Sequence, residues 1–218
     1  MGAEDKVGAV QLNARLSGVS PPVSCRLVIS EQVSLAQLHA ALQVAFGWSD
    51  EHLYVFQIRG WQFGDPARAI ELALAGGGVD MPLAAFAFEI NETFQYHYNL
   101  FVPWKIDCRI ESRSLVAMDQ PLGCLAARGD PPDEELNGPA AYPDWMEGSS
   151  PNWALHQIEE LLDDDLDDER FRAEARDILA NTRLGQPRRR SIDQRLKALP
   201  AVDWDAGRLY ENADPADH

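Results

Sequence analysis

Residues 34–66 read "SLAQLHAALQVAFGWSDEHLYVFQIRGWQFGDP", and this stretch decides the fold. Apolar residues recur at helical spacing behind Ser34, a residue type favoured at a helix N-terminus. Gly47 then ends the periodic run, as a left-handed glycine after a helix would. We therefore expect one long helix over residues 34–46. The following "HLYVFQI" is apolar in both of its alternating sets, which predicts a strand buried on both faces.

Strand patterns surround this helix. "VGAVQLNARL" at 7–16 alternates apolar and polar residues and predicts a half-buried strand, and "VSCRLVIS" at 23–30 predicts an antiparallel neighbour. Residues 85–90 and 94–100 are aromatic-rich strand pieces, and 104–112 predict a final long strand. Residues 66–84 are rich in Ala and Gly and predict a loop. Strands mixed with few helices, and hairpin-like neighbours, predict an α+β fold with a mixed or antiparallel sheet, and no Gly-rich strand–helix turn of the dinucleotide or phosphate-binding type occurs.

The C-terminal third changes in character. Residues 121–151 hold six of the fourteen prolines and predict a loop, and helical patterns follow at about 153–181 and 191–199. We predict a core domain over residues 7–150 and a helical C-terminal extension over 151–200, packed on the core. Residues 201–218 are polar and predict a disordered tail.

The overall charge narrows the function classes. With 19 basic and 35 acidic residues the net charge is −16, which disfavours direct binding of nucleic acid and of anionic membranes. Three cysteines without a CxxC pair argue against a zinc ribbon or a thioredoxin-type site. The first residues lack the apolar run of a secretory signal, and nowhere do eighteen apolar residues follow one another. We expect a soluble cytoplasmic protein without metal or cofactor.

The motifs in residues 34–66 resemble those of the plasmid pRiA4b ORF-3-like family, whose members are often labelled passenger TnpR-like proteins of insertion sequences. That family has a Leu-x-x-Leu-His helix ending in Gly-Trp, then His-Leu-x-x-Phe and Gly-Asp-Pro. The matching residues are Leu35, Leu38, His39, Gly47, Trp48, His52, Leu53, Phe56, Gly64, Asp65 and Pro66. The resemblance extends over about residues 7–200. It implies an α+β roll-like fold and a protein that is carried by, or derived from, mobile elements.

This chain departs from the family pattern at several positions. Residues 99–103, "NLFVP", replace an acidic loop, and Asp130 stands where many members have Cys. A metal or acid–base role that rests on those positions is therefore not expected here. Arg15 and Ser17 superficially match the Arg-x-Ser strand of serine resolvases, but they end a strand of a different fold, so recombinase chemistry is not predicted.

Our leading hypothesis is a non-enzymatic binding or interaction module that takes a protein or a small ligand. Aromatic side chains with polar atoms suit a half-wet pocket. The candidate pocket comprises Trp48, His52, Asp65, Tyr98 and Trp104.

Two alternatives remain open. The first is a hydrolase-like or metal-assisted enzyme built on His52, Asp65 and His97. The second is an accessory nucleic-acid-binding protein that uses the basic cluster at residues 188–190, although the chain's own acidic segment or solvent is the favoured partner of that cluster.

Structural roles compete with these hypotheses. A histidine at a helix–strand junction commonly bonds to neighbouring groups, which fits both His39 and His52. Asp50 and Glu51 suit a solvated turn, and Asp65 suits a turn before Pro66.

Overall fold

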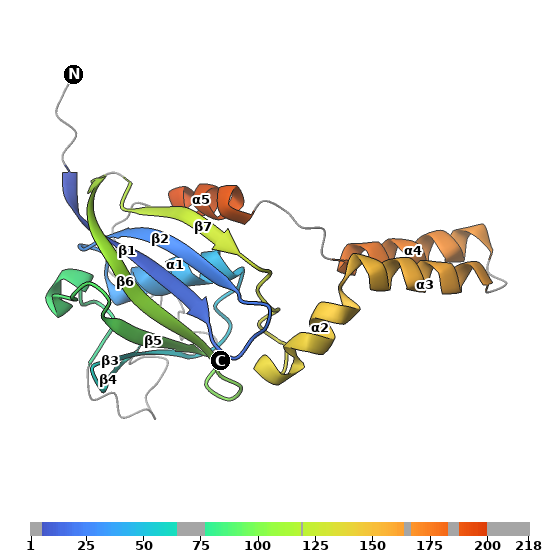
Figure 1. Ribbon diagram of the computed structural model, residues 1–218, viewed down its shortest axis with the longest axis horizontal. Helices are drawn as coiled ribbons and strands as arrows, with labels where there is room; N and C mark the ends of the chain where they lie inside the picture. The colour runs from blue at the N-terminus through green and yellow to red at the C-terminus, as the bar shows by residue number, and fades with distance from the viewer. Residues whose placement is uncertain (1–5, 65–76, 119, 164–166, 183–187, 200–218) are drawn as a thin grey trace, which may run out of the picture.

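The computed structural model describes residues 6–64, 77–118, 120–163, 167–182 and 188–199 (Figure 1). Its described strands form one sheet of seven, in the order β4-β3-β5-β6-β1-β2-β7, and each neighbouring pair is antiparallel. The expected α+β class is therefore confirmed. The strands are β1 (Lys6–Leu16), β2 (Ser24–Ser30), β3 (Tyr54–Ile58), β4 (Trp61–Phe63), β5 (Thr93–Tyr98), β6 (Trp104–Ala117) and β7 (Leu122–Arg128).

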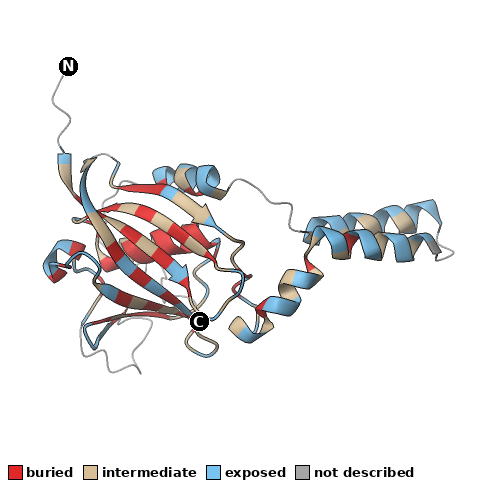
Figure 2. Cartoon of the chain, viewed as in Figure 1, coloured by how far each residue is buried: buried red, intermediate tan, exposed pale blue. Residues whose placement is uncertain are grey.

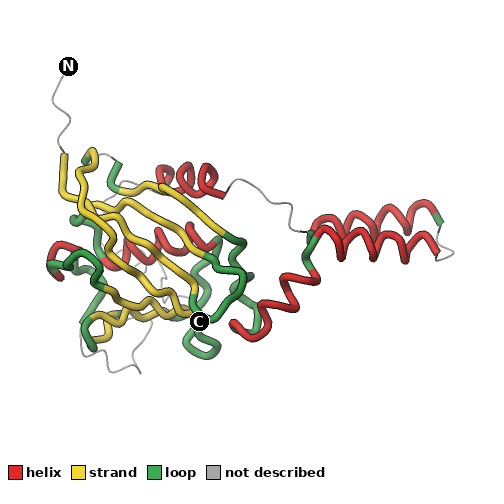
Figure 3. Tube along the Cα trace, in the orientation of Figure 1, coloured by secondary structure: helices red, strands yellow, loops and turns green. Residues whose placement is uncertain are grey.

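The core lies between one face of this sheet and helix α1 (Leu35–Phe46), which Figure 1 shows behind the strands. Successive strand residues point to opposite faces, so the alternating apolar sets of the strands all reach this core. Figure 2 shows the result as alternating buried and less buried positions along β2, β5 and the first half of β6. The opposite face of the sheet is polar, and no helix within the described ranges packs on it (Figure 3).

The signals that predicted α1 act as expected. Ser34 accepts a hydrogen bond from the backbone N–H of Gln37, and the Gln37 side chain accepts one from the Ser34 backbone N–H, which together form a capping box. Gly47 has φ 75°, the left-handed conformation that costs glycine least. Eight of the twelve helix residues are buried. The long packed helix is therefore confirmed.

Several strand predictions need correction. Residues 85–90 are not a strand: a 3₁₀ turn, η1 (Leu83–Phe86), covers part of them. Strand β6 continues to Ala117 and is not the last, because β7 lies inside the predicted loop. The sheet also gains β4, which pairs with β3 through a tight hairpin. Arg59 and Gly60 at its tip both have positive φ, the conformation of a two-residue hairpin turn. The predicted loop over 66–84 lies mostly outside the described residues.

The C-terminal helices are α2 (Tyr142–Gly148), α3 (Pro151–Asp163), α4 (Asp168–Asn181) and α5 (Arg188–Ala198). The single helix expected over 153–181 is wrong, because α3 and α4 lie side by side as a hairpin (Figure 1). Asp167 starts α4 by accepting hydrogen bonds from the N–H groups of Glu169 and Arg170, which is an N-cap in the middle of an acidic run. The α3–α4 hairpin extends away from the sheet, whereas α5 packs on β7.

Helix α5 covers the free edge of the sheet. Asp193 accepts a hydrogen bond from the Cys124 N–H, and Arg189 donates one to the Cys124 carbonyl. Side chains of α5 thus satisfy backbone groups of β7 that would otherwise be available to another strand. The division into domains at residue 150 stays a prediction, and residues 200–218 lie outside the described ranges. Within those ranges each helix is too short or too polar to span a bilayer.

Candidate functional site

Four of the five residues of the candidate pocket lie together at one end of the core. Trp48 stacks on Tyr98 with ring centroids 5.0 Å apart, and its ring centroid lies 6.3 Å from that of Trp104. The His52 ring meets the edge of Tyr98 at 5.5 Å. Asp65, the fifth residue, lies outside the described residues.

The chain itself fills the space that these aromatic residues enclose. The Trp48 indole N–H donates to the Pro132 carbonyl at 3.0 Å, and the Trp104 indole N–H donates to the Glu134 carbonyl at 3.4 Å. Trp48 and Trp104 are buried as a result. We call residues 130–135, which close over the aromatic side chains, the latch segment.

The Glu134 carboxylate is the centre of the latch contact. It accepts hydrogen bonds from the Tyr98 hydroxyl at 2.5 Å and from both the backbone N–H and the hydroxyl of Ser49. Burial opposes its charge, but these donors outweigh burial and hold the pKa of Glu134 below its usual value. Burial and the bond to Glu134 raise the pKa of the Tyr98 phenol. The contact therefore holds a carboxylate against a neutral, buried phenol, an arrangement that suits a structural role.

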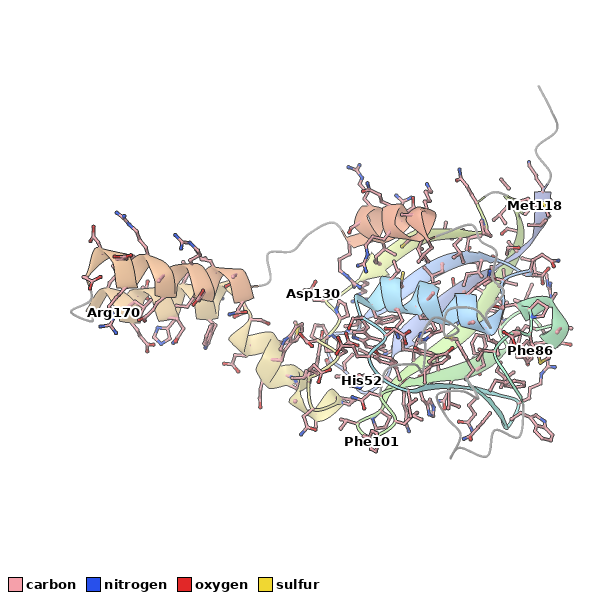
Figure 4. All side chains as sticks on the ribbon, turned by 180° about the vertical axis from the view of Figure 1, so that it is seen from behind. His52, Phe86, Phe101, Met118, Asp130 and Arg170 are labelled. Atoms are coloured by element: carbon pink, nitrogen blue, oxygen red, sulfur yellow. The ribbon has the colours of Figure 1, made fainter. Side chains whose placement is uncertain are left out.

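His52 lies at the outer margin of the latch contact. Its Nε2 is 2.9 Å from a carboxylate oxygen of Glu135, whose side chain is 66% exposed. Figure 4 shows His52 and Asp130 at the end of the core from which α2 leads to the hairpin, with Arg170 near the far end of that hairpin.

His97 does not join His52. It lies on β5 between Tyr96 and Tyr98, which both face the core, so its ring lies on the polar face of the sheet. There His97 Nε2 is 3.2 Å from Gln95, and burial and the nearby Lys105 lower the pKa of His97. Among the described residues no three His, Cys, Asp or Glu side chains are placed to hold a metal ion. His52 and His97 therefore do not form the shared catalytic centre that the hydrolase-like alternative requires.

A second buried polar group forms around His39. Its Nδ1 is 2.7 Å from the Tyr96 hydroxyl and its Nε2 is 3.0 Å from Asp50, while its ring stacks on Tyr54 at 3.7 Å. Gln43 also donates to the Tyr96 hydroxyl. Asp50 is thus bonded to His39, and His52 to Glu135. The sequence offers a partial signal for this group, because a histidine on the apolar face of a helix needs buried partners.

The cysteines are all buried and free of disulfides within the described chain. Burial raises the pKa of the Cys108 thiol, in keeping with an inert core residue. The Sγ atoms of Cys25 and Cys124 lie 3.5 Å apart on neighbouring strands.

The basic cluster at 188–190 has partners that the sequence did not predict. Arg188 donates to backbone carbonyls of Ala45, Arg128 and Gly129, and Arg189 donates to that of Cys124. Both guanidinium groups therefore help to hold α5 against α1 and β7, although Arg189 is exposed, as is Arg190.

The polar face of the sheet carries two rows of side chains rich in arginine, which we did not predict from the sequence. The strand register places Asp107 of β6, Arg15 of β1, Ser24 of β2 and Arg128 of β7 in one row across the sheet, and Arg109, Asn13 and Arg26 in the next. We call the four arginines of these rows the arginine face. A hollow of about 330 Å³ lies beside two of them, Arg26 and Arg128, and is also lined by Asn13, Ser24, Ala126 and Ala127.

One carboxylate organises this face. Glu111 accepts hydrogen bonds from Arg26, Gln11, Asn13 and Arg109, and a bulge in the β1–β6 register turns it toward them. The bond from Arg26, assisted by the two amides, lowers the pKa of Glu111 to about 2 despite its partial burial. Two of the four arginines are therefore tied to Glu111, while Arg15 and Arg128 are exposed at the margin. A signal was present in the sequence, since Arg15 and Arg26 both occupy outward positions of alternating strands.

Comparisons with known proteins agree with the fold and leave the chemistry open. Residues 8–175 match the family described as plasmid pRiA4b ORF-3-like protein. A relative from Sinorhizobium fredii, the uncharacterized protein y4hQ, is 31% identical over 143 residues, which are 63% of this chain and 71% of that protein. A crystal structure of a protein of unknown function, MM3350 from Methanosarcina mazei Go1, covers 76% of this chain and 94% of its own. Its TM-score is 0.57 at 22% identity, a similarity that shows the fold alone.

Proposed function

We propose that this chain, which belongs to the plasmid pRiA4b ORF-3-like family, is a non-enzymatic binding module that recognises an acidic segment of a protein partner through the arginine face. The single observation that carries the proposal is the hollow of about 330 Å³ beside Arg26 and Arg128, on a sheet face that no described helix covers. The mobile-element association implied by the resemblance stays a prediction.

The chemistry of the hollow suits carboxylates. Arginine presents a planar fork of N–H donors that matches a carboxylate, and Ser24 and Asn13 add neutral hydrogen-bonding groups in the middle of the two rows. Adjacent strands lie about 4.8 Å apart, so Arg15 and Arg128, two strands apart, can flank one extended segment. The small side chains of Ala126 and Ala127 leave room for it.

The charge of the whole chain limits the length of the ligand. Net charge −16 repels a long polyanion, but salt at physiological strength screens exposed charges beyond about 8 Å. A short acidic segment can therefore experience the local arginines more strongly than the distant acids. The charge distribution therefore favours an acidic peptide over nucleic acid as the ligand.

A titration tests the proposal. A fluorescently labelled hexaglutamate peptide should bind the full chain at low salt, with an anisotropy change that weakens as salt is added. Arg15→Ala and Arg128→Ala should each weaken binding by about ten- to a hundred-fold, because each removes a charge-assisted contact of roughly 1.5–3 kcal/mol. Arg170→Ala, which removes an exposed arginine of α4, is the matched control and should leave binding unchanged.

The same titration distinguishes the proposed site from two alternatives, a different binding site and a small-acid ligand. Equal affinity for wild type and both arginine-face variants would refute the site. Displacement of the peptide by free citrate at similar carboxylate concentration would identify a small acid, and not a peptide, as the ligand.

A further inference from the structure

The α3–α4 hairpin lacks a core of its own. Within its described residues Ala154 is the buried one, and Figure 2 shows the rest as intermediate or exposed. Helices of this length are marginal in water unless an apolar face is packed. Packing between the two helices therefore leaves apolar side chains of both exposed, namely Leu155 and Leu162 on α3 and Leu179 on α4.

Each helix of the hairpin has two distinct faces. The inner seam between the helices consists of half-buried residues: Gln157, Ile158 and Leu161 on α3, and Phe171, Ala175 and Ile178 on α4. The outer stripe of α3 has Leu155, Glu159 and Leu162 at positions i, i+4 and i+7, with both leucines more than half exposed.

The outer stripe of α4 is the chemical complement of that of α3. It has Arg172, Arg176 and Leu179 at the same spacing, and Leu179 is 51% exposed. One acidic residue, Glu159, thus lies between the two leucines of the α3 stripe, whereas two arginines precede the leucine of the α4 stripe. A body that carries both stripes is complementary to a copy of itself.

We propose that two copies of this chain associate through their hairpins, with the outer stripe of α3 in one copy packed on the outer stripe of α4 in its partner. A twofold axis parallel to the hairpins makes this a closed dimer, because each contact between the two copies then occurs twice. Leu155 and Leu179 both lie at the base of the hairpin, so Leu155 meets the partner's Leu179 and Glu159 meets the partner's Arg176. The product is a four-helix bundle that buries the exposed leucines.

The charges of the hairpin argue against other occupants. Residues 151–181 contain ten acidic and three basic residues, which disfavours a nucleic acid or an anionic membrane. The three basic residues all lie in the sequence of α4, so the stripe of α3 finds its complement on a second hairpin. This surface is separate from the arginine face, and the inference does not depend on the proposed function.

Sedimentation equilibrium of the full chain tests the pairing. The wild type should be a dimer whose fraction rises with concentration. Glu159→Arg and Arg176→Glu should each raise the dimer dissociation constant about ten-fold or more, since each places like charges together twice. An equimolar mixture of the two variants should recover the dimer, because each hybrid interface then contains two opposite-charge pairs. Such recovery also shows that both variants are folded.

Two further variants separate this interface from others. Leu155→Glu combined with Leu162→Glu should abolish the dimer, whereas Leu115→Glu, at an equally exposed position on β6, should not. A wild type that stays monomeric at every concentration, or a mixture that does not recover the dimer, overturns the proposal. Loss of the dimer in Arg15→Glu with Arg128→Glu would also overturn it, because the acidic hairpin would then bind the arginine face.

Discussion

Helices α1 and α3 have almost the same length and very different surroundings. Eight of the twelve residues of α1 are buried, whereas α3 buries Ala154 alone among its described residues. Both carry leucines at helical spacing, but α1 lies on a sheet whose inward residues meet it. We therefore expect substitutions in the core to change the stability of the fold and substitutions in the hairpin to change its association.

The largest effect should come from the aromatic cluster. Trp48→Ala should lower the free energy of unfolding by about 3–5 kcal/mol, because it removes a buried ring and leaves a cavity beside Tyr98. Leu155→Ala in the hairpin should change it by less than about 0.5 kcal/mol. Urea denaturation measures both, and equal losses would show that the hairpin is packed on the core after all.

The latch contact should come next. Glu134→Ala should destabilise the fold by about 1–3 kcal/mol, because it leaves the buried Tyr98 hydroxyl and the Ser49 backbone N–H without their acceptor. The neighbouring Glu135→Ala removes an exposed side-chain contact with His52 and should cost less than about 1 kcal/mol. The same denaturation experiment compares the two adjacent glutamates, and an equal or larger cost for Glu135 would contradict the account of the latch.

Acid should weaken the arginine face through Glu111. Its pKa is about 2 in the folded chain, below about 4.3 for an unfolded glutamate. A depressed folded pKa contributes stability that is fully present above the unfolded value and is lost as the pH falls through the folded value. The stability difference between wild type and Glu111→Gln should therefore shrink from about pH 4.3 toward pH 2. A difference that stays constant over this window would contradict the Glu111 assignment.

The smallest perturbation is local opening. Amide hydrogens of α3 and α4 should exchange with solvent faster than those of β1 and β6, because few buried apolar contacts hold the hairpin in a single copy. Their protection should rise with protein concentration if the hairpins associate. Hydrogen exchange at two concentrations measures this, and core-like protection of α3 and α4 at the lower concentration would contradict the comparison.

Local signals in the sequence predicted the parts of the fold that local interactions determine. Ser34 and Gly47 mark the ends of α1, and the alternation in β1, β2 and β6 indicates which side chains enter the core. Strand β7 was missed because its "LGCLAAR" has small residues and prolines before and after it, and its identity as a strand depends on pairing with β2. The α3–α4 break was missed because Asp167 looked like one more acid in an acidic run.

The residues of the candidate site could be predicted only in part from the sequence. The structure brings the rings of Trp48, His52, Tyr98 and Trp104 together, and their role as a binding pocket stays a prediction. The sequence could not indicate that Pro132 and Glu134, more than eighty residues from Trp48, occupy the space between them. The arginine face depends on the register of β1, β2, β6 and β7, and one residue of slip would turn its side chains inward.

The most direct test of the account is hydrogen exchange of the full chain with and without the hexaglutamate peptide. If the aromatic cluster is a closed structural unit and the arginine face binds acidic segments, the peptide should slow exchange in β1, β2 and β7. Exchange in residues 47–52 and in the latch segment should not change. Protection that appears in the latch segment and leaves β1, β2 and β7 unaffected would contradict the account and return the binding site to the aromatic pocket.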